Sequence, residues 1–209
     1  LISGSTNVTV ADLEVYSLNS WTAGIFCRDS SEIRILNYTA SGPWERGGNL
    51  GIMLLRASNV LIDNADISGF DDYEASAGIS LFDIDRNQQN NLRNITILNS
   101  RITDNYHGIT TRLREPEYTN VKTESINGLT IKNTTIADNK RSGIYISGVK
   151  SVTDVTIENS TIADNGGYGI YIFAMDSLTN FTIGNSTITN NWIDGILITE
   201  VDLANHVTI

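Results

Sequence analysis

The sequence predicts an all-β parallel solenoid, in which short strands stack on their equivalents from one turn of the coil to the next. The main evidence is a triplet of the pattern apolar, any residue, β-branched that recurs along the whole chain. Further columns of residues keep register with this triplet, and no helix-length apolar stripe interrupts them. The triplets begin 25, 27, 35, 34, 26, 26 and 26 residues apart, at Val8, Ile33, Val60, Ile95, Leu129, Val155, Phe181 and Val207. We therefore expect a single-stranded coil of about seven rungs of 25–27 residues, two of them longer.

Two columns define the rest of each rung. An Asn, or Asp in the first rung, stands two residues after each triplet, at Asp12, Asn37, Asn64, Asn99, Asn133, Asn159 and Asn185. A Gly-Ile pair opens the next β-type segment, beginning at Gly24, Gly51, Gly78, Gly108, Gly143, Gly169 and Gly195. Alternation along Gly-Ile-x-Ile predicts that the apolar residues fill the bore. Cys27 belongs to that inward column, so we expect it to be a buried core residue and not a reactive thiol.

These columns resemble the right-handed parallel β-helix superfamily, which includes pectate-lyase-like enzymes, phage tailspikes and cell-surface β-helix proteins. The Asn column is similar to the asparagine ladder of that fold, and we expect it to point inward. The resemblance covers the whole chain and implies one domain over residues 1–209. We expect an excerpt of a longer chain, since it starts at Leu1 and ends on a newly begun triplet. One scaffold serves many activities, so fold alone leaves function open.

Composition excludes several classes of function. The 209 residues carry 14 Lys+Arg against 24 Asp+Glu, a net charge of -10, which argues against a nucleic-acid partner. No apolar run is long enough for membrane insertion. A single cysteine rules out an internal disulfide framework. By the resemblance, we expect an extracellular or cell-surface location.

Long turns suggest a groove over the Gly-Ile strands of rungs one to four. The turn before Gly-Ile is long at residues 41–50 and 68–77, and the turn after it at 83–93 and 112–127. The floor would be the outward side chains of these strands, including Phe26, Arg28, Met53, Leu55, Ser80, Phe82, Thr110 and Arg112. Aromatic rings pack against the apolar faces of sugars, and arginines bind anionic ones. The substrate-binding candidates are Arg28, Arg56, Trp44, Tyr145, Tyr171 and Phe173.

Tyr145 and Tyr171 are expected to stack one rung apart. Their role is open between sugar binding, a stabilising cross-rung pair and a contact to another chain.

A polysaccharide lyase needs a base and a cation that stabilises the developing charge. The resemblance implies an Arg or Lys base with acidic ligands for Ca²⁺, and the catalytic candidates are Arg112, His107 and Arg114. Asp83, Asp85 and Asn87 have the spacing of the opening of a calcium loop, although Gln88 replaces its glycine. A solvated acidic turn is the alternative for them. Tyr106-His107-Gly108 is similar to a polygalacturonase motif, but neighbouring rungs supply no carboxylate there, which disfavours a hydrolase.

Seven N-x-S/T sequons are present. Asn7, Asn94 and Asn180 precede the triplet strands and are the glycosylation candidates. The remaining four belong to the Asn column, where we expect too little room for a glycan, and they are Asn37, Asn133, Asn159 and Asn185.

Two functions remain. The first is a rigid extracellular or cell-surface scaffold that binds glycans or partner chains. The second is a lyase or epimerase acting on an acidic polysaccharide in the groove over rungs one to four. The expected partner is a polysaccharide or a surface glycan. Open solenoid ends also predict self-association, because end strands carry unpaired backbone groups.

Overall fold

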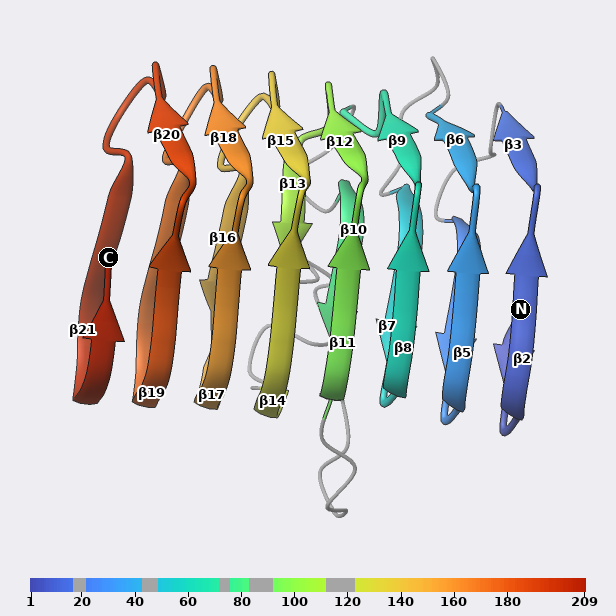
Figure 1. Cartoon of the computed structure of the whole chain (residues 1–209), viewed down its shortest axis with the longest axis horizontal. Helices are drawn as coiled ribbons and strands as arrows, with labels where there is room; N and C mark the ends of the chain where they lie inside the picture. The colour runs from blue at the N-terminus through green and yellow to red at the C-terminus, as the bar shows by residue number, and fades with distance from the viewer. Residues whose placement is uncertain (17–21, 43–48, 72–75, 83–91, 112–122) are drawn as a thin grey trace.

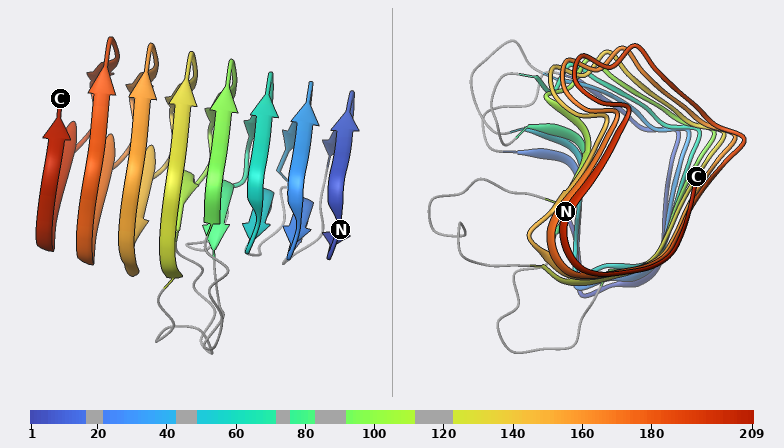
Figure 2. Two further views of the ribbon diagram at one scale, coloured as in Figure 1. Left: turned by 60° about the horizontal axis from the view of Figure 1, so that its bottom comes forward. Right: turned by 90° about the vertical axis from the view of Figure 1, so that its left-hand side faces the viewer.

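The computed structural model is a parallel β-solenoid whose rungs run along one axis, with the two termini at opposite ends (Figure 1). It describes residues 1–16, 22–42, 49–71, 76–82, 92–111 and 123–209. Viewed along the axis, successive rungs superpose into one coil (Figure 2). The predicted all-β solenoid is confirmed. Within the described ranges, no helix has the length and apolar character needed to span a bilayer.

Each rung contributes a strand to three faces. The Gly-Ile face is formed by β1 (Ile2–Ser3), β4 (Ala23–Arg28), β7 (Leu50–Leu55), β10 (Ala77–Phe82), β13 (His107–Thr110), β16 (Ile144–Ser147) and the first halves of β19 (Ile170–Gly184) and β21 (Ile196–Thr208). The triplet face is formed by β2 (Thr6–Ala11), β5 (Ser31–Leu36), β8 (Ser58–Asp63), β11 (Leu92–Leu98), β14 (Thr123–Lys132), β17 (Val149–Glu158) and the second halves of β19 and β21. The third face is formed by β3 (Glu14–Tyr16), β6 (Thr39–Ser41), β9 (Asp66–Ser68), β12 (Arg101–Thr103), β15 (Thr135–Ala137), β18 (Thr161–Ala163) and β20 (Thr187–Thr189).

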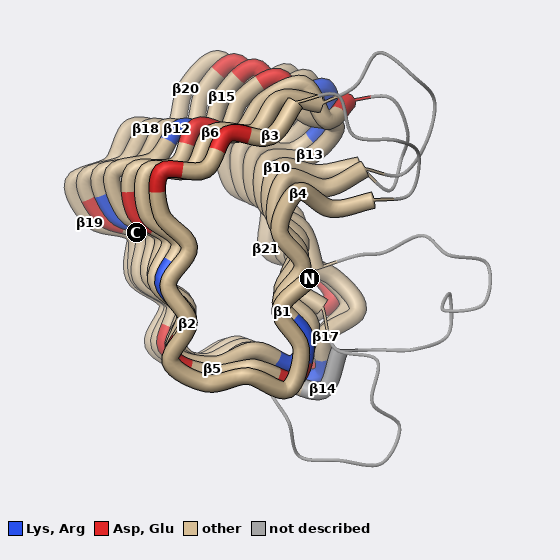
Figure 3. Tube along the Cα trace, turned by 90° about the vertical axis from the view of Figure 1, so that its right-hand side faces the viewer, with Lys and Arg blue, Asp and Glu red and all other residues tan. Residues whose placement is uncertain are grey.

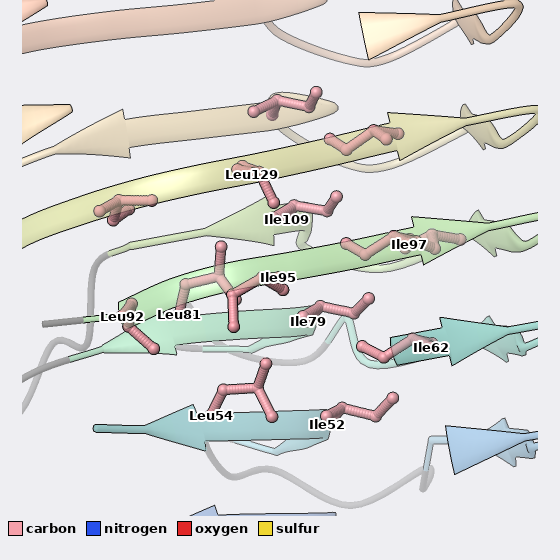
Figure 4. Close-up of a cluster of buried hydrophobic side chains, with 14 of the residues drawn as sticks. Ile52, Leu54, Ile62, Ile79, Leu81, Leu92, Ile95, Ile97, Ile109 and Leu129 are labelled. Carbon is pink, nitrogen blue, oxygen red and sulfur yellow. The ribbon is translucent and has the colours of Figure 1, made fainter. Parts of the chain in front are cut away.

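The columns identified in the sequence match the register of the sheets, because residues of one column pair with each other on neighbouring strands. Ile25 pairs with Ile52, which pairs with Ile79, and the column continues in register to Ile196. The inward side chains of the Gly-Ile and triplet faces meet in the bore (Figure 4). Cys27 lies among them with no exposed surface, and burial raises the pKa of its thiol to about 11. The prediction of a buried core cysteine is confirmed.

Bends between faces are made by residues with left-handed backbone. The Asn column is one such bend, with φ between 49° and 55° at Asp12 and each Asn after it. Asn is among the residues that tolerate this conformation best. The expectation that this column points inward is wrong, because these side chains are exposed at the corner between the triplet and third faces.

The inward asparagine ladder lies in a different column, which follows the third face. It consists of Asn105, Asn139, Asn165 and Asn191, and the first three are buried. The side-chain oxygen of Asn139 accepts from the backbone N–H of Asn105 at 3.1 Å, and its amide nitrogen donates to the oxygen of Asn165 at 2.9 Å. That nitrogen also donates to the Ile102 carbonyl at 3.4 Å. This column satisfies turn backbone groups that would otherwise be buried without partners.

Glycine opens the Gly-Ile strands because the backbone at this position packs closely against the next rung of the coil. A Cβ on Gly108 would stand 2.5 Å from both the Gly143 carbonyl oxygen and the Ile136 Cγ2 methyl. No side chain fits at that distance, which explains the invariance of this column along the chain.

Candidate functional site

An array of six rings covers the outside of the Gly-Ile face on rungs four to six, and we call it the ring platform. Its members are Tyr106, His107, Tyr145, Tyr168, Tyr171 and Phe173. Tyr145, Tyr171 and Phe173 point outward because the residues that alternate with them on β16 and β19, such as Ile146 and Ile172, point into the bore.

The centre of the platform is a pair of tyrosines in register. Tyr145 on β16 pairs with Tyr171 on β19, and their ring centroids are 5.5 Å apart in an edge-to-face arrangement. Phe173 stacks on Tyr171 with centroids 5.2 Å apart. Tyr145 and Tyr171 therefore lie one rung apart in contact, as predicted, but their rings meet edge to face and are not stacked. Phe173 extends the contact along the same strand.

The platform continues toward rung four through residues that stand before glycines. His107 lies 4.8 Å from the Tyr145 ring and 5.2 Å from the Tyr106 ring, centroid to centroid. Arg141 donates from Nε to the Tyr106 hydroxyl at 3.2 Å, and its guanidinium carbon lies 5.8 Å from the centre of that ring. A cation therefore borders the rung-four end of the platform.

The rings are half-buried, so each keeps part of its surface for a ligand. Burial, together with the nearby Tyr168, Tyr145 and Glu200, raises the pKa of Tyr171 above its ordinary value. Tyr171 is thus a neutral phenol over the whole physiological range. A surface of rings with hydroxyl groups at their edges suits a sugar, which has apolar faces and a polar rim.

Sequence reasoning named four of these rings, His107 as a catalytic candidate and the other three as binding candidates, but it missed Tyr106 and Tyr168 and the neighbouring Arg141. A usable signal was present. Tyr168 stands one residue before Gly169 and Tyr171 two residues after it, and the two centroids lie 4.4 Å apart. Tyr168 could have been found by comparing the residues on either side of the glycine within one rung, as well as the equivalent residues of successive rungs.

The expected groove floor on rungs three and four is not open. Ser80, Phe82 and Thr110 are 0%, 3% and 1% exposed, although they occupy outward positions on β10 and β13. This part of the prediction is wrong. A groove floor must be accessible to a substrate, and these three side chains are buried. The face is more open on either side of these positions: Phe26 and Met53 are half-buried and Arg28 is exposed on rungs one and two, and the half-buried rings of the platform follow in the other direction.

The arginines expected to bind an anionic substrate contact one carboxylate. Arg56 makes two hydrogen bonds to Asp29, at 2.5 Å from Nε and 2.9 Å from a terminal nitrogen. Arg28 reaches the same carboxylate at 3.1 Å. The bond from Arg56 is the main cause of the lowered pKa of Asp29. An anionic sugar would have to compete with Asp29 for both guanidinium groups.

His107 is the one catalytic candidate that falls within the described residues. Its Nδ1 accepts a hydrogen bond from the Ser142 backbone N–H at 3.3 Å. Because Ser142 belongs to the next rung, this bond fixes the orientation of the imidazole ring relative to that rung. Arg112, Arg114 and the binding candidate Trp44 lie outside the described residues. So do the calcium candidates Asp83, Asp85 and Asn87. Elsewhere, in the ranges that the structure describes, no three His, Cys, Asp or Glu side chains gather in a way that would hold a metal ion.

The sequon asparagines do not divide into exposed and inward-facing groups as expected. Asn7, Asn94 and Asn180 are exposed, so their candidacy as glycosylation sites stays a prediction. The argument that excluded the other four is wrong, because Asn37, Asn133, Asn159 and Asn185 are exposed as well.

Comparison with known proteins now assigns the family. A model described as "Right handed beta helix region" matches residues 1–113 and 89–208, which together cover nearly the whole chain. The chain belongs to the right-handed β-helix family. This assignment supplies the hand of the coil, which the repeat pattern alone leaves open. No match was found among curated proteins.

Solved structures share the fold at low sequence identity. The A-module of mannuronan C-5 epimerase AlgE4 from Azotobacter vinelandii matches with a TM-score of 0.61 and 17% identity, over 96% of this chain and 54% of that one. A polygalacturonase from Erwinia carotovora matches at 0.62 and 15%, over 97% and 58%. The surface adhesin PfbA of Streptococcus pneumoniae matches at 0.51 and 17%, over 99% and 62%. The β-helix chain spans a little over half the length of these structures, and the likeness concerns the fold.

Proposed function

We propose that this β-helix is an extracellular scaffold that binds glycans through its ring platform. The observation that carries the proposal is the run of contacting rings from Tyr106 to Phe173, half-exposed on the outside of three successive rungs. Successive rungs present rings at about 4.8 Å, the spacing of stacked strands. A saccharide laid along the axis would therefore meet rings repeatedly without any change in the fold.

The chemistry of the surface supports a sugar over an apolar partner. Five of the six rings carry a hydroxyl or a ring nitrogen, so hydrogen-bonding groups lie next to each apolar face. A purely structural cluster would gain from being buried completely. The half-exposed state of the rings instead fits a surface that exchanges water for a ligand.

The similar structures support the same class of ligand. They are named as an epimerase of mannuronan, a polygalacturonase and a surface adhesin. Two of these names describe proteins that act on polysaccharides, and the third describes a surface protein. The extracellular location of this chain is part of the proposal for the same reason.

Affinity electrophoresis in gels containing alginate or polygalacturonate tests the proposal. Replacing Tyr145 and Tyr171 together with Ala should weaken retardation at least tenfold, about 1.4 kcal/mol of binding free energy, because the centre of the platform is removed. Tyr16→Ala is the matched control, since Tyr16 is an exposed tyrosine on the third face, bonded only to Glu14 among the described contacts. Equal retardation of the double variant and the wild type would refute glycan binding by the platform.

A lyase or epimerase is the second candidate, and the surroundings of His107 favour it. An imidazole, a phenol and a guanidinium lie together at one end of the platform, on His107, Tyr106 and Arg141. These are group types that can remove a proton beside a carboxylate and stabilise the resulting charge.

Enzymatic activity is tested by incubating uronic-acid polymers with the protein, with and without chelator. Unsaturated product absorbing in the ultraviolet indicates a lyase, and a changed epimer ratio in the proton NMR spectrum indicates an epimerase. Activity that survives unchanged in both His107→Ala and Arg112→Ala would remove these residues from the reaction. No change in any polymer would leave the scaffold as the function.

A further inference from the structure

We infer that the protein has a second saccharide site, on the corner of the coil that lies across the bore from β4 and β10 (Figure 3). A groove of about 440 Å³ follows the bend between the triplet and third faces over rungs two to five. We call it the corner groove. One wall is Asn37, Asn64, Asn99 and Asn133, the other is Thr39, Asp66, Arg101 and Thr135, and Ala65 and Ser100 lie between them.

The groove exists because of the left-handed bend. Asn64 turns the chain outward at φ 55°, Ala65 returns it to the core, and Asp66 begins β9 outside. Repetition of this bend on neighbouring rungs extends the hollow along the axis. Three steps between four rungs give a length of about 14 Å, and pockets of this volume suit small ligands.

The Asn wall keeps hydrogen-bonding capacity for a ligand. Asn64 donates to the Asn37 oxygen at 2.9 Å and Asn133 donates to the Asn99 oxygen at 3.1 Å. Each amide nitrogen has two hydrogens and these bonds use one, so a second donor remains on each. The row of side-chain hydrogen bonds along the Asn wall is also interrupted, because Asn99 donates to Asp63 and not to Asn64. The Asn64 oxygen consequently accepts no bond from the described side chains.

The charges of the groove favour a neutral ligand. Arg101 is the one lining cation, and it lies 3.5 Å from Asp66 and 4.0 Å from Asp104. Its charge therefore faces two carboxylates, Asp66 in the wall and Asp104 beside the groove, and an acidic ligand would have to compete with both. The remaining groups are amides and hydroxyls, which both donate and accept. Hydroxyl groups of an uncharged oligosaccharide meet these requirements, whereas an apolar molecule would leave the amides unsatisfied.

The corner groove differs from the ring platform in chemistry as well as in place. The platform offers rings and binds through apolar faces, and the groove offers fixed amides and binds through hydroxyl groups. The two sites lie on different faces of one rod. The inference is therefore independent of the proposed function of the platform.

The test titrates cellopentaose and mannopentaose into the protein while proton–nitrogen NMR spectra are recorded, with pentagalacturonate as the acidic comparison. We expect saturable shifts in the side-chain amide signals of the groove asparagines with a neutral probe. Asn64→Asp combined with Asn99→Asp should weaken binding at least tenfold. Asp retains the left-handed bend but removes the amide donors and adds charge.

Two controls make the result specific. Asn159→Asp changes the same column at the same backbone conformation, φ 50°, one rung beyond the groove, and should bind like the wild type. Replacing Tyr145 and Tyr171 with Ala should also leave this binding unchanged, which separates it from the platform. The inference is overturned if neither neutral probe shifts these signals. Equal binding by the double Asp variant, or loss of binding in Asn159→Asp, would overturn it too.

Discussion

At the scale of single residues, the fold depends on which asparagine column faces the core. Two columns of asparagines run along the same rod, and only one of them is buried. Asn139 bonds three partners inside the turn, whereas Asn133 stands at an exposed corner with one bond to Asn99. Asparagine therefore has two roles: in the buried column it forms hydrogen bonds to buried backbone groups, and in the exposed column it adopts the left-handed backbone conformation of the bend.

Replacing Asn139 with Ala should lower the free energy of unfolding by about 3 kcal/mol. The Asn105 N–H and the Ile102 carbonyl would then be buried without their present partner, at about 1–3 kcal/mol for each such group. The matched change Asn133→Ala should cost about 1 kcal/mol, mainly for the left-handed backbone. Chemical denaturation measures both, and equal losses would contradict the assignment of the ladder.

Cys27 provides a prediction with a defined pH window. Its folded pKa is about 11, above the ordinary thiol pKa of 9.0, so the unfolded chain ionises first as the pH rises. The contribution of the thiol is complete below pH 9 and is lost as the pH approaches 11, by up to about 3 kcal/mol. Urea unfolding of the wild type and of Cys27→Ala at several pH values should show this extra slope only in the wild type. Identical slopes would mean that the thiol is accessible in the folded state.

At the scale of strands, interior rungs differ from end rungs in how many neighbours they pair with. β10 pairs on both sides, with β7 and β13, while β21 pairs with β19 alone among the described strands. A strand paired on both sides uses all its backbone groups, and one at an edge leaves alternate groups to water.

Hydrogen exchange should therefore divide the strands by position. We expect amides in β7 and β10 to exchange at least a hundredfold more slowly than those in β21, because their opening requires disruption of two interfaces, at a cost of about 3 kcal/mol or more. Mass spectrometry of peptides from each strand measures the difference. Uniform exchange from end to end would indicate a single cooperative unit in place of semi-independent rungs.

The sequence predicted strands and register well because each rung repeats the same local choices. The Gly-Ile pairs and the triplets specify inward positions directly, and Ile25, Ile52 and Ile79 stack as expected. The site was predicted less well. Whether Ser80 or Thr110 faces solvent depends on what covers the outside of the strand, and the column pattern carries no such information. The inward Asn ladder was missed because both candidate columns have similar composition.

At the scale of the whole molecule, the chain is a rod with different chemistry along its sides. The ring platform lies on the Gly-Ile face, and the corner groove lies at the bend between the other two faces. Asp and Glu recur along the outside of the coil, in keeping with the net charge of -10 (Figure 3). Net charge does not describe either site, because the platform is built from aromatic rings bordered by Arg141, and the one arginine of the groove pairs with Asp66.

The last rung should mediate self-association of the 209-residue chain. Leu203 and Val207 on β21 are exposed, and Ile198 on the first half of the same strand is a half-buried residue packed against the core. Changing Leu203 and Val207 to Lys should shift sedimentation velocity toward monomer across a concentration series, because charge on an edge strand opposes pairing. Thr156→Lys, on the triplet face in the middle of the rod, is the control. A wild type that stays monomeric at all concentrations would contradict this expectation.

The central claim is that the ring platform binds a glycan, and a crystal structure with a bound oligosaccharide tests it most directly. Crystals soaked with oligogalacturonate or oligomannuronate should show a sugar ring against Tyr145 or Tyr171, with the chain of sugars directed along the rod axis. A well-ordered saccharide bound elsewhere, with the rings of Tyr145, Tyr171 and Phe173 uncovered, would contradict the claim.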